Sequence, residues 1–150
     1  MAGSIHSRSL KEGARMERQE ESIYRGDIYY VYLEPAAGSE QSGIRPVVIV
    51  QNDTGNHFSP TVIIAAISTK RKKRFLPTHV PIRSCDRLRP GSMVLAEQIR
   101  TMDKMRLMEK IGTLSPKEQK KVDRALAVSF GLESKVKKPA KWKSKPLQIK

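Results

Sequence analysis

Short runs of apolar, β-branched and aromatic residues alternate with polar, glycine- or proline-containing segments through the middle of the chain. Runs of this kind predict strands at residues 26–33, 47–51, 61–68, 78–82, 93–99 and 111–114. Two of them, 47–51 and 61–68, are apolar almost throughout, which is typical of strands buried on both faces. We interpret residues 52–60 as a turn-rich connection, and residues 100–110 have room for one helical turn.

The pattern changes from strand to helix spacing after residue 114. Ser115 fits an N-cap, Pro116 the first helical position and Glu118 the third position of a capping box. One apolar helix face is predicted from residues that recur at helical spacing, namely Val122, Ala125, Leu126 and Ser129. Gly131 then fits the end of the helix.

These elements predict a mainly β fold with a C-terminal helix (α+β), built as a small, curved antiparallel sheet or SH3-like barrel. Residues 1–22 are polar without sustained periodicity, and residues 134–150 are rich in lysine, so both ends are predicted to be disordered. The remaining domain, 23–133, is large enough to bury a core.

The net charge of +14 is unevenly distributed. Residues 134–150 hold seven lysines and no acidic residue, which is half of the excess, while residues 23–133 hold 18 basic and 11 acidic residues. Lysine clusters attract polyanions through counterion release, although a merely solubilising tail is an equal alternative. Because the domain itself is basic, its charge favours a nucleic-acid partner.

Other function classes receive little support from the sequence. No apolar stretch approaches the ~18–20 residues that span a bilayer, and no secretory leader is recognisable. Cys85, the single cysteine, excludes an intramolecular disulfide and suits a reducing cytoplasm; we expect a surface thiol rather than a nucleophile.

Metal and nucleotide cofactors are not expected either. The three histidines, His6, His57 and His79, lie far apart, and no HExxH or CxxC motif occurs. His79, in a short edge strand, is interpreted as structural. No GxxxxGK[ST] or GxGxxG motif is present.

Residues 24–27, with the sequence YRGD, are interpreted as a structural turn. Gly26 permits a tight turn, and Asp27 either pairs with Arg25 or caps a neighbouring loop.

Arg45 and Ser68 are the candidates for chemistry. Arg45 stands beside Pro46 directly before one buried strand, and Ser68 ends the next. If the two strands are antiparallel neighbours, both residues lie at the same rim. An arginine stabilises charge that develops on a phosphate, and the 2′-hydroxyl of RNA can attack without a metal. The alternative is that Arg45 pairs with an acid such as Glu97 and only holds the fold.

A series of motifs occurs in order between residues 24 and 132: YRGDIYYVYLEPAAGSEQSGIRPVVIVQND, GNHFSPTVIIAAIS, LPTHVPI, LAEQIRTMDKMRL and IGTLS. Together they resemble the MazF/PemK-type toxin endoribonucleases, notably those of Gram-positive bacteria. The resemblance implies a curved, SH3-related sheet with a C-terminal helix, working as a homodimer. It also implies metal-independent cleavage of single-stranded mRNA at short motifs, leaving 2′,3′-cyclic phosphate and 5′-hydroxyl ends. A MazE-like antitoxin with an acidic, flexible segment would neutralise the toxin.

The resemblance assigns the catalytic residues. The family's arginine in its G-x-RPV motif corresponds to Arg45, and its threonine at the end of the AAI strand corresponds to Ser68. The second match is a departure, because serine keeps the hydroxyl but lacks the methyl group that restrains the rotamer. Activity is expected to persist, at a reduced level.

The RNA-binding candidates rest on the same resemblance and on side-chain chemistry. The loop bordering the family's RNA groove corresponds to Gly38, Ser39, Glu40 and Gln41. Asn52 and Gln98 could bind base edges or cap strand ends, and Phe58 could stack on a base or anchor its loop in the core. A backbone contact is expected from Lys70, Lys72 and Lys73, with a solvated charge run as the alternative.

Two other functions stay open at this stage. The same fold serves toxins that poison DNA gyrase by binding, for which Arg45 would be unimportant. A nucleic-acid-binding module without catalysis is the third interpretation, and it would bind RNA without cutting it.

Overall fold

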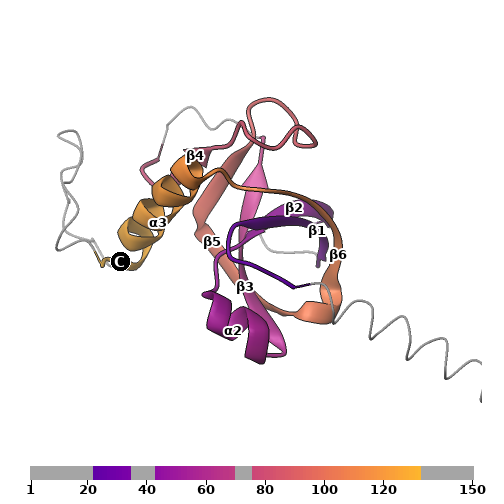
Figure 1. Ribbon diagram of the computed structural model, residues 1–150. Coiled ribbons are helices and arrows are strands. Elements are labelled where there is room, and N and C mark those ends of the chain that lie inside the picture. Colours follow the sequence, from indigo (N-terminus) through magenta and orange to yellow (C-terminus); the bar gives the residue numbers. More distant parts are fainter. Residues whose placement is uncertain (1–21, 35–42, 70–75, 133–150) are drawn as a thin grey trace, which may run out of the picture.

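The computed structural model describes residues 22–34, 43–69 and 76–132, which form a curved antiparallel sheet with a C-terminal helix (Figure 1). In chain order the elements are β1 (Asp27–Leu33), β2 (Gly43–Ile49), α2 (Asp53–Phe58), β3 (Thr61–Ser68), β4 (His79–Pro81), β5 (Met93–Asp103), the 3₁₀ helix η1 (Lys104–Arg106), β6 (Leu107–Thr113) and α3 (Pro116–Phe130). The predicted fold class is therefore confirmed. Apart from Ser22, the predicted terminal segments 1–22 and 134–150 lie outside the described residues.

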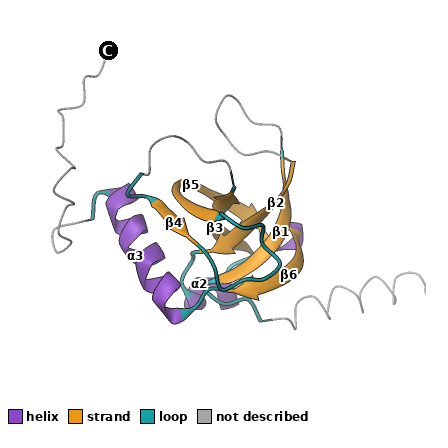
Figure 2. Ribbon diagram, turned by 90° about the horizontal axis from the view of Figure 1, so that it is seen from above, coloured by secondary structure: helices purple, strands orange, loops and turns teal. Residues whose placement is uncertain are grey.

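The strand order in the sheet is β4-β5-β3-β2-β1-β6, and every neighbouring pair is antiparallel. Seen from above, the strands curl around one another while α3 lies along one side (Figure 2). In the described part of the chain the outer strands, β4 and β6, do not pair with each other, so the sheet is open rather than a closed barrel.

The sheet is buried on both faces, as predicted for its central strands. On one face α3 contributes Val122 and Leu126 to a core that also holds Val48 of β2. On the other face Val47 and Ile64 pack in a second core, to which the described helices contribute no buried residue. Alternate residues of β2 and β3 therefore enter different cores, which explains their nearly continuous apolar sequence.

The predicted capping box of α3 is confirmed. The Ser115 hydroxyl accepts from the backbone N–H of Glu118, and the Glu118 carboxylate accepts from the backbone N–H of Ser115. Val122, Ala125 and Leu126 form the buried face, and Gly131 ends the helix at a φ of +71°. Every signal of this helix is local, so the sequence was sufficient to locate it.

The connection at 52–60 was predicted wrongly, because residues 53–58 form α2. Asn52 caps this helix by accepting from the backbone N–H of Gly55 at 2.8 Å. Asn56 is buried and donates to the carbonyl oxygen of Gln51 at 2.9 Å. The Asn and Asp residues that favour turns also cap helices, so composition alone did not separate the two outcomes.

The strand boundaries after residue 93 also differ from the prediction. β5 runs to Asp103 and β6 begins at Leu107, with only η1 between them. The pairing between β3 and β5 shifts between Ala65, opposite Ile99, and Ala66, opposite Leu95, so residues 96–98 form a bulge. A bulge interrupts the alternation of inward and outward side chains, which hid the length of the strand. β2 likewise begins at Gly43, earlier than predicted.

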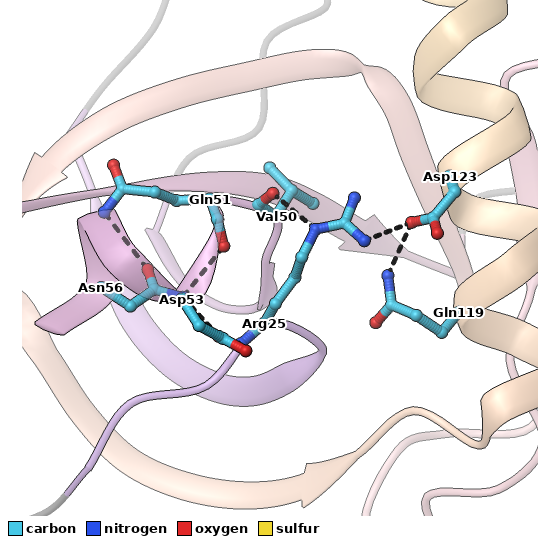
Figure 3. Close-up of polar contacts among 7 residues, drawn as sticks. All are labelled: Arg25, Val50, Gln51, Asp53, Asn56, Gln119 and Asp123. Atoms are coloured by element: carbon cyan, nitrogen blue, oxygen red, sulfur yellow. Dashed lines mark hydrogen bonds and ion pairs between the residues drawn. The ribbon is translucent and has the colours of Figure 1, made fainter.

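The turn at residues 24–27 joins α2, the residue that follows β2, and α3 through Arg25 (Figure 3). The Arg25 guanidinium donates to the carbonyl oxygen of Val50 at 3.1 Å and pairs with Asp123 of α3. Its backbone N–H donates to Asp53.

Gly26 adopts a φ of +94°, as expected for a tight turn. Asp27 accepts from the backbone N–H of Tyr24 and from the Thr113 hydroxyl. It therefore caps the turn, while Arg25 pairs with Asp123 instead.

Candidate active site

Three neighbouring strands meet at one rim of the sheet, where β2 begins, β3 ends and β5 begins. Ser68 lies directly opposite Met93 of β5. On its other side, β3 pairs with β2 through Val47 opposite Ala66, and continuing this register by two residues places Arg45 opposite Ser68. The expectation that the two strands are antiparallel neighbours is confirmed, and it brings the two candidate residues to the same rim.

Arg45 and Ser68 line a pocket of about 190 Å³, which we call the rim pocket. Its walls are Tyr30, Ile44, Arg45, Pro46, Ile67, Ser68, Thr69, Arg87, Leu88, Arg89 and Ser92. Arg45 is half-buried, whereas only 4% of Ser68 is exposed. A buried hydroxyl beside a half-buried guanidinium provides a hydrogen-bond donor and a fixed positive charge in one small space.

The rim pocket is cationic. Arg45, Arg87 and Arg89 line it, and none of the described residues in its wall is acidic. Arg87 binds Glu109 of β6 through both guanidinium NH₂ groups, at 2.7 and 3.1 Å. The hydrogen bond and charge of Arg87 hold the pKa of Glu109 below its usual range, and those of Glu109 raise the pKa of Arg87.

Glu97, considered above as a partner for Arg45, holds the edge strand β4. Its two carboxylate oxygens bind His79 Nε2 at 2.6 Å and the hydroxyl of Thr78 at 2.9 Å. His79 is buried in this contact, which accords with its interpretation as a structural residue.

Two predicted RNA contacts lie at the opposite rim of the sheet. Asn52 follows β2 and Phe58 ends α2, so a whole strand length, on the order of 20 Å, separates them from Arg45. The side-chain oxygen of Asn52 caps α2. Phe58 is 78% exposed, so its alternative interpretation as a core anchor was wrong.

Phe58 lines a different pocket, of about 640 Å³. None of the residues of the rim pocket contributes to its wall. Gln98 lies in the bulge of β5 and lines neither of these two pockets.

The other predicted contacts fall on segments that adjoin the rim pocket along the chain but lie outside the described residues. One segment connects β1 to β2 and holds Gly38, Ser39, Glu40 and Gln41. The second follows β3 directly and holds Lys70, Lys72 and Lys73.

Sequence reasoning missed Arg87, Arg89 and Ser92, which complete the wall of the rim pocket. They belong to the segment RSCDRLRPGS, which was interpreted only as a loop. Its signal was the Pro-Gly pair directly after Arg89 and before a strand, which is typical of a tight turn that fixes its neighbours.

Cys85 of the same segment was expected at the surface, and this expectation was wrong. Its thiol is buried and donates to the carbonyl oxygen of Ile111 at 3.4 Å. Cysteine is small and tolerates apolar surroundings, so it fits this interior position. Its charged neighbours in the sequence indicated a surface position instead.

The described ranges contain no group of three or more His, Cys, Asp or Glu side chains arranged to hold a metal ion. Nor does any helix there combine the length and the apolar character needed to cross a membrane.

Comparison with known proteins gives consistent matches. A sequence model of the PemK-like, MazF-like toxins of type II toxin–antitoxin systems matches residues 24–130. The chain is 55% identical over 111 residues to Endoribonuclease MazF of Staphylococcus saprophyticus, which covers 73% of this chain and 92% of the relative. The family match spans all the strands that the structure describes and the whole of α3.

Solved structures agree in fold. An endoribonuclease from Mycobacterial species has a TM-score of 0.61 at 28% identity, covering 74% of this chain and 93% of that chain. An endoribonuclease in complex with its cognate antitoxin, also from Mycobacterial species, has a TM-score of 0.60 at 30% identity. That match covers 73% of this chain and 96% of the other.

Proposed function

Because the chain belongs to the PemK-like, MazF-like toxins of type II toxin–antitoxin systems and is an endoribonuclease of this family, we propose that Arg45 and Ser68 form its catalytic site. In this proposal it cuts single-stranded RNA, including mRNA, at short motifs and without a metal. The observation that carries the proposal is that Arg45 and Ser68 line one cationic pocket, at the rim where β2 begins and β3 ends.

The proposed reaction is an internal transesterification. The 2′-oxygen of the substrate attacks the adjacent phosphorus, and the bond from phosphorus to the 5′-oxygen breaks. The 2′-hydroxyl loses a proton and the leaving 5′-oxygen gains one, which gives 2′,3′-cyclic phosphate and 5′-hydroxyl ends. The extra negative charge on the phosphate oxygens is stabilised by the guanidinium of Arg45, and the Ser68 hydroxyl donates a hydrogen bond to the same group.

The scaffold fixes the backbone of both residues before the substrate arrives. Pro46 restrains the backbone beside Arg45, and Ser68 is held at the end of a strand that is paired on both sides. Such fixed geometry lowers the barrier without reorganisation during the reaction.

The proposal extends to partners and location. A relative is described in complex with its cognate antitoxin, and the net charge of +14 is complementary to an acidic, flexible antitoxin segment. We also propose a homodimer, as in the family that the sequence resembles, and a cytoplasmic location, which the single cysteine and an mRNA substrate favour.

Cleavage in excess EDTA tests the proposal. Purified protein, an Arg45→Ala variant and an Arg83→Ala control, which removes the same charge outside the rim pocket, are incubated with a long single-stranded RNA. We expect discrete cuts with cyclic-phosphate ends from the parent and the control, and none from Arg45→Ala. Intact RNA with folded parent protein would contradict catalysis and favour simple binding, and equal cutting by Arg45→Ala would remove that residue from the site.

A further inference from the structure

Residues 82–92 connect β4 to β5, and we call them the arginine loop. The ends of the loop are joined, because the backbone N–H of Ile82 donates to the carbonyl oxygen of Ser92 at 3.0 Å. Ser92 directly precedes Met93, which lies opposite Ser68. The loop therefore returns the chain to the rim where the proposed catalytic residues lie.

The first half of the arginine loop is fixed to α3 and β6. The buried carboxylate of Glu118 accepts from the backbone N–H of Arg83 at 2.7 Å and from the hydroxyl of Ser84. The buried thiol of Cys85 donates to the carbonyl oxygen of Ile111. These contacts hold the base of the loop in one position.

The second half of the loop ends in a tight turn from Arg89 to Ser92. The carbonyl oxygen of Arg89 accepts from the backbone N–H of Ser92 at 3.2 Å and from its hydroxyl at 2.6 Å. Pro90 occupies the second position, and Gly91, at a φ of +82°, the third, which is the pattern of a type II turn. The backbone of Arg89 is therefore held rigidly at the rim pocket.

The two pocket-lining arginines of the loop differ in their contacts. Arg87 is committed to Glu109 by two hydrogen bonds. The guanidinium of Arg89 forms no hydrogen bond or ion pair with any described residue, yet it lines the same pocket as Arg45 and Ser68. A rigid backbone that presents such a guanidinium beside a phosphate-binding site is suited to a second phosphate.

We propose that Arg89 is a further substrate-binding residue, whose guanidinium binds a phosphate of the RNA backbone next to the phosphate held at Arg45 and Ser68. This inference rests on the proposed function, since it assumes RNA in the rim pocket. Its role is to position the strand, not to stabilise the reacting phosphate. The fixed turn reduces the conformational entropy lost on binding.

Binding of a non-cleavable RNA tests the proposal independently of catalysis. The probe is a single-stranded RNA with 2′-O-methyl groups throughout, and its affinity is measured by fluorescence anisotropy over a range of KCl concentrations. Arg89→Ala should weaken binding about tenfold, as expected for a lost charge-assisted contact. It should also reduce the slope of log affinity against log salt by about 0.7, the value for one phosphate contact on a single strand.

Two variants provide controls. Arg83→Ala removes one charge from the same loop outside the rim pocket, and it should leave the salt slope unchanged. Arg89→Lys keeps the charge but loses the forked geometry, so it should keep the slope and lose only part of the affinity. Equal, small effects of Arg83→Ala and Arg89→Ala would overturn the proposal.

Cleavage kinetics separate positioning from catalysis. Arg89→Ala should raise KM with kcat nearly unchanged, while Arg45→Ala should abolish kcat. A fall of kcat in Arg89→Ala comparable to that of Arg45→Ala would overturn a positioning role. If the parent protein cuts no RNA, the proposed function fails, but the salt slopes of the non-cleavable RNA still decide whether Arg89 binds a phosphate.

Discussion

Arginines at two rims of the same sheet serve different purposes. At the α2 rim, Arg25 binds Val50, directly after β2, and Asp123, and so joins the end of β2 to α3 (Figure 3). At the other rim, the guanidinium of Arg89 has no partner among the described residues, although its backbone is held by a hydrogen-bonded turn. The first arginine stabilises the fold with its side chain, whereas the second is stabilised by the fold and offers its side chain to a ligand.

The contacts of the two arginines distinguish a structural arginine from a ligand-binding one, which their charge alone does not. Both rims are rich in polar residues, but at the α2 rim Asp53 and Asp123 accept from Arg25. The wall of the rim pocket, within the described residues, contains three arginines and no acid. Of these arginines, Arg89 has a guanidinium without an acceptor among the described residues, which leaves its hydrogen bonds to a ligand.

The largest expected effect concerns the hydroxyl in the rim pocket. Ser68→Ala should lower kcat by about 10² to 10³, the usual cost of removing a hydrogen-bond donor to a developing charge. Ser68→Thr restores the family's residue and should equal or exceed the parent, because the added methyl group restrains the hydroxyl. The measurement is single-turnover cleavage in EDTA with thermal unfolding as a fold control. A Ser68→Ala variant within threefold of the parent would deny the hydroxyl a role in catalysis.

The next effect tests the α2 rim. Arg25→Ala should reduce the free energy of unfolding by roughly 1–2 kcal/mol, because it removes the hydrogen bonds to Val50 and Asp123. Cleavage by the folded fraction should stay close to that of the parent. Urea unfolding measures the first quantity and cleavage well below the transition the second. Loss of cleavage without loss of stability would reverse the roles assigned to the two rims.

Glu118 links α3 to the arginine loop, and its contribution to the stability of the fold depends on pH. Burial alone would raise its pKa, but hydrogen bonds from the Ser84 hydroxyl and from the backbone N–H groups of Arg83, Ser115 and Ser84 outweigh this and lower the pKa. The carboxylate therefore stabilises the fold above its unfolded pKa, and this contribution is lost as pH falls through the lower, folded pKa.

Glu118→Gln should accordingly destabilise the protein at neutral pH by roughly 1–3 kcal/mol, since an NH₂ group then faces N–H donors. The difference from the parent should begin to shrink as pH falls below the ordinary pKa of glutamate, and it should vanish only below the lower, folded pKa, where the parent carboxylate becomes protonated. Urea unfolding at a series of pH values measures it. A difference that stays constant from neutral to acidic pH would show that the charge of Glu118 is unimportant.

The smallest expected effect tests the contrast between Arg87, which is paired with an acid, and Arg89 in the rim pocket. Glu109→Gln removes the acid that holds Arg87, so a second guanidinium becomes available to RNA. Binding of the 2′-O-methyl RNA should strengthen by about threefold at low salt and lose this gain at high salt, where surface charges are screened. Weaker binding would mean that the Arg87–Glu109 pair serves mainly to shape the loop.

The elements predicted correctly carry their signals locally. The capping box at Ser115 and Glu118 and the apolar run of β3 needed no information about distant residues. The meeting of Arg45 and Ser68 was also predictable, because antiparallel neighbours bring the start of one strand to the end of the next.

The features missed depend on distant contacts. α2 requires the burial of Asn56 against Gln51, and the length of β5 is hidden by a bulge that only its pairing with β3 reveals. Arg89 reaches the site because Glu118 and Ile111, from the end of the domain, hold the arginine loop in place. No pattern within RSCDRLRPGS specifies those anchors.

The burial of Cys85 makes this residue a probe for opening of the arginine loop. As the single cysteine of the sequence, it can be labelled without ambiguity. Only 7% of Cys85 is exposed and its sulfur packs against Gly112, so a thiol reagent has little access while the arginine loop is docked. The labelling rate therefore follows how often the loop opens, and a comparison with and without RNA would reveal whether substrate holds it closed.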